Sequence, residues 1–435
     1  PLINKLQQNI QWGQRGNFVD VPTDCPQRQE RLGWTGDAQV FAPTAAFNMD
    51  VASFFTKWMG DVAADQREDG SVGHIIPFLD VLGEGGFGSA AWGDAAAVIP
   101  YTIYQYYGDT RILEHQYESM KAWVEFMRKE AGEGYLYNTG FHYGDWLAYA
   151  TDNSDYPGAT TDKDIISSAY FACSTNILMK TAKILGRAED AALYSEWLEN
   201  IKVAFDEEFI SKSGRVGSNT QTAYALALAF DLVPEEKEAQ AAERYANDIR
   251  KFGHITTGFV GTPLVCLVLS KYGYNEEAFN LLTRKEYPSW LYPVTQGATT
   301  IWERWDGIRP DGSFNTMSAF ADEADEEVMN SFNHYAYGAI GDWMYKVIAG
   351  IDFADGEPGF KKIAIKPVIG GGLTNVDATH ECMYGTISSS WEIEDGKVTL
   401  EVEIPPNTTA EIFAPNLVGE YEKHEVGSGK YVFTR

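Results

Sequence analysis

The sequence lacks the features that would point to several common classes of protein. Its four cysteines lie far apart with no CxxC pair, which fits free thiols better than a disulfide framework or a zinc site. The seven histidines include no HxH or HExxH pair, so no metal or other cofactor is expected. The GxSxG and GxxxxGK[ST] motifs are absent, which leaves no signature of a serine hydrolase or a P-loop enzyme.

Positive charge and long apolar runs are also scarce. With 34 Lys and Arg against 62 Asp and Glu, the formal net charge is -28, which argues against nucleic-acid and anionic-membrane partners and favours a role in solubility. No run reaches the roughly 20 apolar residues of a transmembrane helix. No signal peptide is recognised, and the abrupt start is typical of a fragment, which leaves localisation and oligomeric state open.

Apolar and aromatic residues, by contrast, are abundant. Apolar residues make up 44% of the 435 residues, enough for a large core, and the length suggests roughly two to three domains. Aromatic residues reach 14%, with 12 tryptophans and 24 tyrosines. Rings with a polar edge are common in clefts that bind sugars, although a large helical core also uses them.

From about Asn48 to Gly350 the pattern is helical and repetitive. Each unit has an apolar helix, a short turn, and a helix with Glu and Lys on one face, as expected of an inner and an outer layer. The turns are expected at Gly108–Asp109, near Gly186, at Val233–Pro234 and at Gly273. Such hairpins form an open solenoid or a closed α/α toroid. Long linkers rich in Gly, Trp and Asp precede the inner helices and favour the closed barrel, with a funnel at one end.

After Gly350 the sequence alternates apolar and polar residues at period two, as in "GTISSSWEIEDGKVTLEVEIP". Turn signals separate these runs, which predicts a small antiparallel β-sandwich that leans on the helical domain. We expect a lead-in segment at 1–22, a helical domain at 23–350 and a β-sandwich domain at 351–435.

The stretch "DCPQRQERLGWTGDAQ" crowds acidic residues into a segment with no apolar period. Asp24, Glu30 and Asp37 lie within it, and a helix is expected to begin only near Thr35 or Gly36. Either these acids converge on a ligand, or they form an ion-pair network with Arg28 and a neighbouring arginine that pins the loop. The residues alone give the two readings about equal weight.

A second candidate is "TTIWERWDG", where Glu303 lies between Trp302 and Trp305. A glutamate flanked by indoles can have a shifted pKa, and indoles are natural platforms for sugars. The alternative is a glutamate bound in an ion pair with an arginine.

Two further loops place an Asp beside a Trp, and one histidine stands near the start of an inner helix. Trp92 and Asp94 lie in "AWGDA", and Asp145 and Trp146 lie in "YGDWLA". Acceptors for sugar hydroxyls beside an aromatic plane suit a pyranose pocket; the alternative is that each Asp caps the helix that follows. His334, in "SFNHYAYGA", contacts a ligand or is a satisfied core residue.

In order along the chain, "DCPQRQERLGWTGDAQ", "AWGDA", "YGDWL", "QTAYALAL", "TTGFVGTP", "TTIWERWDG" and "SFNHYAYGA" resemble the bacterial α-L-rhamnosidases of glycoside hydrolase family 78. The resemblance covers almost the whole helical region, and the tail resembles the family's C-terminal β-sandwich. Two features depart from the family. The β domains that usually precede the barrel are absent, and Gln29 stands where many members have an acid that could raise the pKa of Glu30.

The resemblance implies an (α/α)6 barrel that hydrolyses terminal α-L-rhamnosyl bonds of glycosides or polysaccharides with inversion. Glu30 resembles the general acid and Glu303 the general base that activates water. The implied contacts with the sugar are the carboxylates Asp24, Asp37 and Asp145, the indoles Trp34, Trp92 and Trp146, and His334. Asp94 and Trp302 are added as candidate contacts from their place in the motifs "AWGDA" and "TTIWERWDG". An inverting pair needs a gap of about 6.5 to 9.5 Å for the water, which loops far apart in sequence can supply.

Two alternatives remain at this stage. One is another glycosidase or a polysaccharide lyase on the same toroid; a lyase acting on uronic acids needs a cationic pocket, whereas these loops are acidic and aromatic. The other is a carbohydrate-binding protein that has lost turnover. The presence of both Glu30 and Glu303 argues against a pure binder.

Overall fold

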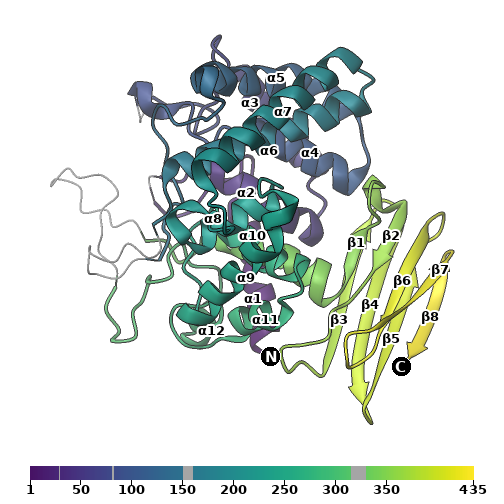
Figure 1. Ribbon diagram of the computed structural model, residues 1–435. Helices are drawn as coiled ribbons and strands as arrows, with labels where there is room; N and C mark the ends of the chain where they lie inside the picture. Colours follow the sequence, from purple (N-terminus) through teal and green to yellow (C-terminus); the bar gives the residue numbers. More distant parts are fainter. Residues whose placement is uncertain (29, 81–82, 150–159, 315–329) are drawn as a thin grey trace.

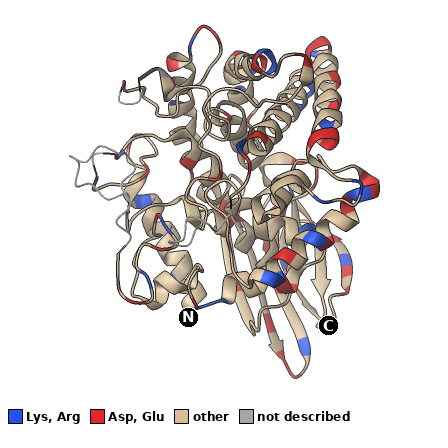
Figure 2. Cartoon of the chain, turned by 60° about the vertical axis from the view of Figure 1, so that its left-hand side comes forward, with Lys and Arg blue, Asp and Glu red and all other residues tan. Residues whose placement is uncertain are grey.

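The computed structural model describes residues 1–28, 30–80, 83–149, 160–314 and 330–435. A helical body occupies most of the chain, and a β domain with the C-terminus packs against one side of it (Figure 1). Acidic and basic residues are interspersed on helices and strands alike (Figure 2). No helix in the described ranges is long and apolar enough to cross a membrane. All four cysteines are free.

The helical body is built from consecutive hairpins, and the four turns predicted from the sequence are confirmed. The hairpins are α2 (Thr35–Asn48) with α3 (Ala52–Asp65), α4 (Ala95–Tyr107) with α5 (Arg111–Ala131), α6 (Lys163–Ile184) with α7 (Ala188–Phe209), α8 (Gln221–Ala229) with α9 (Glu235–Phe252), and α10 (Thr262–Lys271) with α11 (Asn275–Thr283). Helix α4 ends at Tyr107 and is capped by Gly108, whose φ of 70° is the left-handed conformation that glycine adopts without strain.

The inner helices close into a ring. Each of α2, α4, α6, α8 and α10 packs against the next, and α13 (Ile340–Trp343) contacts both α10 and α2. The lead-in residues form a helix, α1 (Leu2–Asn17), which buries Leu6 and Ile10 and packs beside α12 (Leu291–Thr295). The ring is therefore a closed barrel and not an open solenoid.

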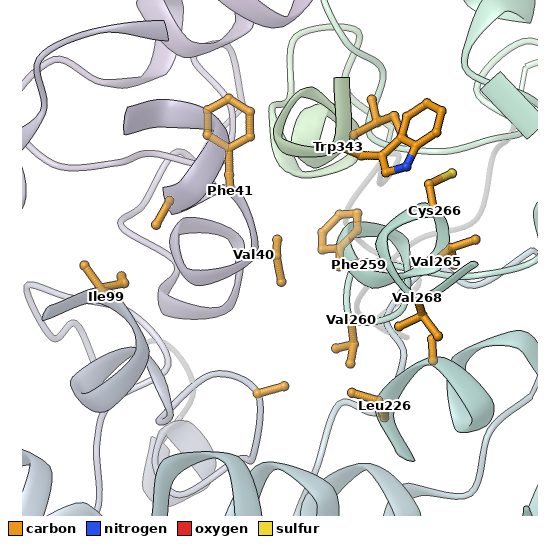
Figure 3. Close-up of a cluster of buried hydrophobic side chains, with 14 of the residues drawn as sticks. Val40, Phe41, Ile99, Leu226, Phe259, Val260, Val265, Cys266, Val268 and Trp343 are labelled. Atoms are coloured by element: carbon orange, nitrogen blue, oxygen red, sulfur yellow. The ribbon is translucent and has the colours of Figure 1, made fainter. Parts of the chain in front are cut away.

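The inner layer is apolar because it is covered on both sides. Eight of the nine residues of α8 are fully buried, whereas α9 exposes a charged face. Figure 3 shows Val40 and Phe41 of α2 across from Phe259, Val260 and Leu226 inside the ring. The inner helices also bury some polar side chains, among them Asp37 and Gln39 of α2 and Asp342 of α13.

The β domain is a sandwich of two four-stranded sheets. One sheet has the order β1 (Ile351–Phe353), β2 (Lys362–Ile365), β6 (Thr409–Pro415), β7 (Tyr421–Val426) and the other β3 (Asn375–Cys382), β4 (Gly385–Glu394), β5 (Lys397–Ile404), β8 (Gly429–Thr434). The predicted antiparallel pairing holds for every pair except β2 and β6, which run parallel. The chain leaves the first sheet after β2 and returns beside it only at β6.

The sandwich is hydrogen-bonded to the barrel, as predicted. The buried Trp391 indole donates to the Ile348 carbonyl at 2.9 Å, and the Ser389 hydroxyl donates to Ala349 at 2.6 Å. Tying buried polar groups across a junction in this way fixes the orientation of the two parts. The domain boundaries at 22 and 350 remain a prediction.

Candidate active site

The acidic stretch forms a loop between α1 and α2 that is closed by Asp24. The Asp24 backbone N–H donates to the Leu32 carbonyl at 3.1 Å, and the Leu32 N–H donates to the Asp24 carboxylate at 2.9 Å. These two bonds join Asp24 to Leu32 and so close the loop that contains Arg28 and Glu30. Helix α2 starts at Thr35, as predicted from the sequence. Gln29 lies outside the described residues.

Arg28 brings three carboxylates together. Its Nη1 lies 2.7 Å from Glu303 Oε2, and its Nη2 lies 3.1 Å from Glu303 Oε1, 2.6 Å from Glu30 Oε2 and 3.4 Å from Asp24 Oδ2. The guanidinium is 9% exposed. Its planar fork bonds Glu303 bidentately, which a lysine could not do. The ion-pair network considered from the sequence is thus present, and it includes Glu303. That these acids converge on a ligand remains a prediction.

The contact with Arg28 limits how far apart Glu30 and Glu303 can be. Glu30 Oε2 and Glu303 Oε1 touch the same Nη2 atom, at 2.6 and 3.1 Å. These two oxygens therefore lie within about 6 Å of one another. This separation is shorter than the gap of about 6.5 to 9.5 Å expected of an inverting pair, so it brings the two carboxylates into one site but does not by itself support inversion. Arg28 and Glu303 are 275 residues apart in the sequence.

Glu303 is held rigidly. Its side chain is 1% exposed, and besides Arg28 it accepts a hydrogen bond from the Ser331 N–H at 2.6 Å. The Glu303 N–H in turn donates to the Ser331 carbonyl at 2.9 Å. The Ser331 hydroxyl accepts a bond from the Gln27 amide, which links this segment to the acidic loop.

Glu30 has the electrostatic character of a proton donor. Burial, followed by the negative charge of Asp24, raises its pKa to about 8; Arg28 opposes the shift, and the charge of Glu303 adds to it. Burial also raises the pKa of Asp24 to about 6, with the charge of Asp37 adding and that of His334 opposing. Glu30 is consequently protonated over much of the neutral range, as a general acid requires.

Asp37 and His334 form a buried pair beside these groups. His334 Nε2 lies 3.0 Å from Asp37 Oδ1, and the two side chains are 2% and 5% exposed. Burial works against a charged imidazole, but the hydrogen bond to Asp37 and its negative charge outweigh burial and raise the pKa of His334. His334 is thus a buried residue with an acidic partner in the predicted site.

Aromatic rings line the same region. Trp34 and Trp92 are 8% and 2% exposed, and Tyr143 contacts both, with ring centres 6.0 and 4.5 Å away. Gly36 allows this packing: a Cβ at that position would lie 2.5 Å from the Trp92 ring. The half-buried Trp146 also contacts Tyr143, at 5.6 Å.

Trp302 sits in a separate cluster beside Glu303. It is 5% exposed and packs with Tyr292 and Phe332. The predicted indoles are thus divided between two groups, with Trp34, Trp92 and Trp146 in one and Trp302 in the other.

Asp94 and Asp145 have both carboxylate oxygens occupied by donors of the protein itself. Asp94 accepts bonds from the Trp123 indole at 2.9 Å, the Ser174 hydroxyl at 2.5 Å and the Ala91 N–H at 2.7 Å, and it does not cap α4 through its side chain.

Asp145 braces a neighbouring loop. It accepts a bond from the Thr222 hydroxyl and from three backbone N–H groups, at 2.8 Å from Gly258, 2.9 Å from Val260 and 3.1 Å from Gly261. Substrate contact by Asp94 and Asp145 remains a prediction; the geometry favours their positioning of helices and loops.

The contacts of two residues at the site, Arg28 and Tyr143, were not predicted from the sequence. The sequence suggested that Arg28 neutralises nearby acids, but not that it bonds Glu303. Tyr143, the first residue of the "YGDWL" motif, was not singled out, although a tyrosine three residues before a Trp in an aromatic-rich loop is a usable signal. Within the described parts of the chain, no group of three or more His, Cys, Asp or Glu side chains is arranged to hold a metal ion.

Comparison with known families identifies the two parts of the chain. Residues 1–348 match the bacterial alpha-L-rhamnosidase 6 hairpin glycosidase domain, and residues 350–429 match the bacterial alpha-L-rhamnosidase C-terminal domain. The chain belongs to the bacterial α-L-rhamnosidase family. The resemblance inferred from the sequence motifs and the predicted fold class are both confirmed.

Relatives and solved structures agree with this membership. An alpha-L-rhamnosidase of Streptomyces avermitilis is 42% identical over 450 aligned residues, covering 100% of this chain and 41% of the relative. A crystal structure of S. avermitilis alpha-L-rhamnosidase complexed with L-rhamnose matches with a TM-score of 0.91 at 41% identity, over 100% of this chain and 41% of that chain. Native α-L-rhamnosidase from Aspergillus terreus gives 0.90 at 39% identity, over 100% and 49%. The chain spans less than half the length of these relatives.

Proposed function

We propose that this chain hydrolyses terminal α-L-rhamnosyl bonds by an inverting mechanism. The observation that carries the proposal is the pair of glutamates, Glu30 and Glu303, that meet at Arg28 in different environments. Membership of the α-L-rhamnosidase family supports the activity, and the L-rhamnose complex of the S. avermitilis enzyme supports rhamnose as the sugar.

Glu30 and Glu303 divide the chemistry between them. Protonated Glu30 donates its proton to the glycosidic oxygen as the bond to the anomeric carbon breaks. Glu303, held by Arg28 and Ser331, accepts a proton from the water that attacks the opposite face of the sugar. Glu30 ends as a carboxylate and Glu303 as a carboxylic acid, and one proton exchanged with solvent at each restores the starting state.

The predicted residues nearest the two glutamates hold the sugar. Asp24 and the Asp37–His334 pair supply acceptors and a donor for hydroxyl groups. The indoles Trp34 and Trp92 form an apolar wall. L-rhamnose carries a methyl group where other hexoses carry a hydroxymethyl group, so such a wall favours it, by about 1–3 kcal/mol.

The stereochemistry of the first-formed sugar tests the mechanism. Proton NMR of rhamnose released by the 435-residue chain from p-nitrophenyl α-L-rhamnoside should show the β anomer first. Early appearance of the α anomer would remove the water-activating role of Glu303.

A substrate panel and calorimetry test the activity itself. We expect turnover of α-L-rhamnosides and none of uronic-acid polysaccharides, which a lyase on the same barrel would cleave. L-rhamnose binding without hydrolysis of any rhamnoside would instead indicate a carbohydrate-binding protein.

A further inference from the structure

Three aromatic rings form a continuous line from the buried wall of the site to solvent. Trp92 is 2% exposed, and Tyr143 lies against it with ring centres 4.5 Å apart. Phe141 packs edge-on against Tyr143 at 4.9 Å and is 53% exposed. A large apolar ring at that exposure, in contact with the rings of a candidate active site, offers a contact surface beside it.

The middle ring of this line is held in place by a buried histidine. The Ser89 N–H donates to His74 Nε2 at 2.9 Å, so the His74 proton is on Nδ1, which lies 3.2 Å from the Tyr143 hydroxyl. Burial, followed by the charge of His142, lowers the pKa of His74 to about 3, which keeps this imidazole neutral. Tyr143 and the Phe141 packed on it therefore form a rigid surface.

The line of rings Trp92, Tyr143 and Phe141 adjoins the loop of Glu30 and not the segment of Glu303. Tyr143 contacts Trp34, which belongs to the same loop as Glu30, at 6.0 Å edge-on. Burial, and then the charges of Asp37 and Glu30, raise the pKa of Tyr143. In glycoside hydrolysis the leaving group departs from the side of the proton donor.

A second exposed ring lies on the side of Glu303 and provides a contrast. Phe314 is 55% exposed and packs edge-on against Phe332 at 6.0 Å, which in turn contacts Trp302 at 5.1 Å. Phe332 follows Ser331, whose N–H bonds Glu303. In an inverting reaction water approaches from that side.

We propose that Phe141 is the platform for the leaving group and that it favours planar aromatic aglycones. The Lys163 ammonium lies 5.3 Å from the centre of the Phe141 ring and supplies a donor for a hydroxyl group of the aglycone. This inference rests on the proposed function, because it needs Glu30 to act as the acid.

The test compares two substrates in two matched variants. Methyl α-L-rhamnoside has a leaving group too small to reach Phe141, whereas 2-naphthyl α-L-rhamnoside presents two fused rings. Phe141→Ala should lower kcat/KM for the naphthyl substrate about three- to tenfold, mostly through KM, since stacked aromatic pairs contribute that much. It should leave the methyl substrate within about twofold. Phe141→Trp should retain the preference.

Phe314→Ala is the control, because it removes an equally exposed ring from the other side. It should change neither substrate. A loss shared equally by both substrates in Phe141→Ala, no loss in that variant, or a naphthyl-specific loss in Phe314→Ala would each overturn the platform. If the wild type hydrolyses neither substrate, the proposed function itself is overturned, and the platform with it.

Discussion

Glu30 and Glu303 contact the same guanidinium but have different surroundings. Glu303 is 1% exposed and accepts hydrogen bonds from both arms of Arg28 and from a backbone N–H. Glu30 is 18% exposed and meets Arg28 through one oxygen, while burial and the charge of Asp24 raise its pKa to about 8. The same residue type is therefore built once as a fixed carboxylate and once as an acid that can release its proton.

The comparison shows how one cation serves two roles. The bidentate bond to Glu303 uses one N–H donor from each Nη nitrogen of the guanidinium and places the positive charge directly against that carboxylate. Glu30 receives only part of the same charge, and Asp24 and Glu303 nearby offset it. Two carboxylates in different environments, of which Glu30 has a raised pKa, are the pattern expected of an acid and a base in hydrolysis.

The largest predicted effect separates the two glutamates by their dependence on the leaving group. Glu303→Gln should lower kcat by about 10³-fold or more on every rhamnoside, because no group then accepts the proton of water. Glu30→Gln should lower kcat on methyl α-L-rhamnoside by the same factor. On 2,4-dinitrophenyl α-L-rhamnoside, whose leaving group needs no proton, the factor by which kcat falls should be about 10 to 100 times smaller. Steady-state rates on the two substrates measure this difference.

The control for this experiment is a buried glutamate outside the site. Glu277 pairs with Arg250 on the outer helices, with Arg250 Nε 2.7 Å from its carboxylate. Glu277→Gln should leave both rates within about twofold. Equal leaving-group dependence in Glu30→Gln and Glu303→Gln would remove the distinction between acid and base.

The second prediction removes the shared cation. Arg28→Met should lower kcat/KM about 10²-fold and cost about 3 kcal/mol of stability, since it leaves buried carboxylates without their partner. Arg28→Lys keeps the charge but not the fork and should lose about tenfold. Because Arg28 lowers the pKa of Glu30, the basic limb of the pH profile should move to higher pH in Arg28→Met. A limb that does not move would show that Arg28 is not coupled to the acid.

The sequence was sufficient for the local features of this fold. The turn at Gly108 and the start of α2 at Thr35 depend on residues within a few positions, so they could be located before the structure was known. The density of acids and glycines around Glu30 likewise indicated a loop and not a surface helix, but it left a ligand site and an ion-pair network equally open. The family motifs supplied Glu303 as its partner.

Contacts between segments far apart in the chain could not be predicted from the sequence. Nothing near Arg28 shows that it bonds a carboxylate 275 residues away. The partners of Asp145, which include Thr222 and the backbone around Val260, are equally remote, and so is the parallel pairing of β2 with β6. Such pairings depend on how whole elements pack, which local propensity does not encode.

The third prediction concerns the pH dependence of the rate. With the pKa of Glu30 at about 8, kcat/KM of the wild type should fall about tenfold per pH unit above that value, as the acid loses its proton. Glu30→Gln, assayed with the dinitrophenyl substrate, should lack this basic limb because it has no proton to lose. Persistence of the limb in that variant would assign it to another group.

The smallest predicted effect is on stability: Glu30→Gln should lose activity but gain stability. The pKa of Glu30 is about 8 in the folded chain against an ordinary value of 4.5, so the folded state binds more protons than the unfolded state between these values. The contribution of Glu30 to the free energy of unfolding therefore falls as pH rises from about 4.5 to 8.

Glu30→Gln removes this decline and should be more stable than the wild type by about 1–2 kcal/mol at pH 8.5, with a smaller difference at pH 5. Urea unfolding at the two pH values measures it, with Glu277→Gln as the control. Glu303→Gln should be less stable than the wild type at both values, because Arg28 loses its bidentate partner. A gain in Glu30→Gln that did not change with pH would mean that the acid is not protonated in the folded state.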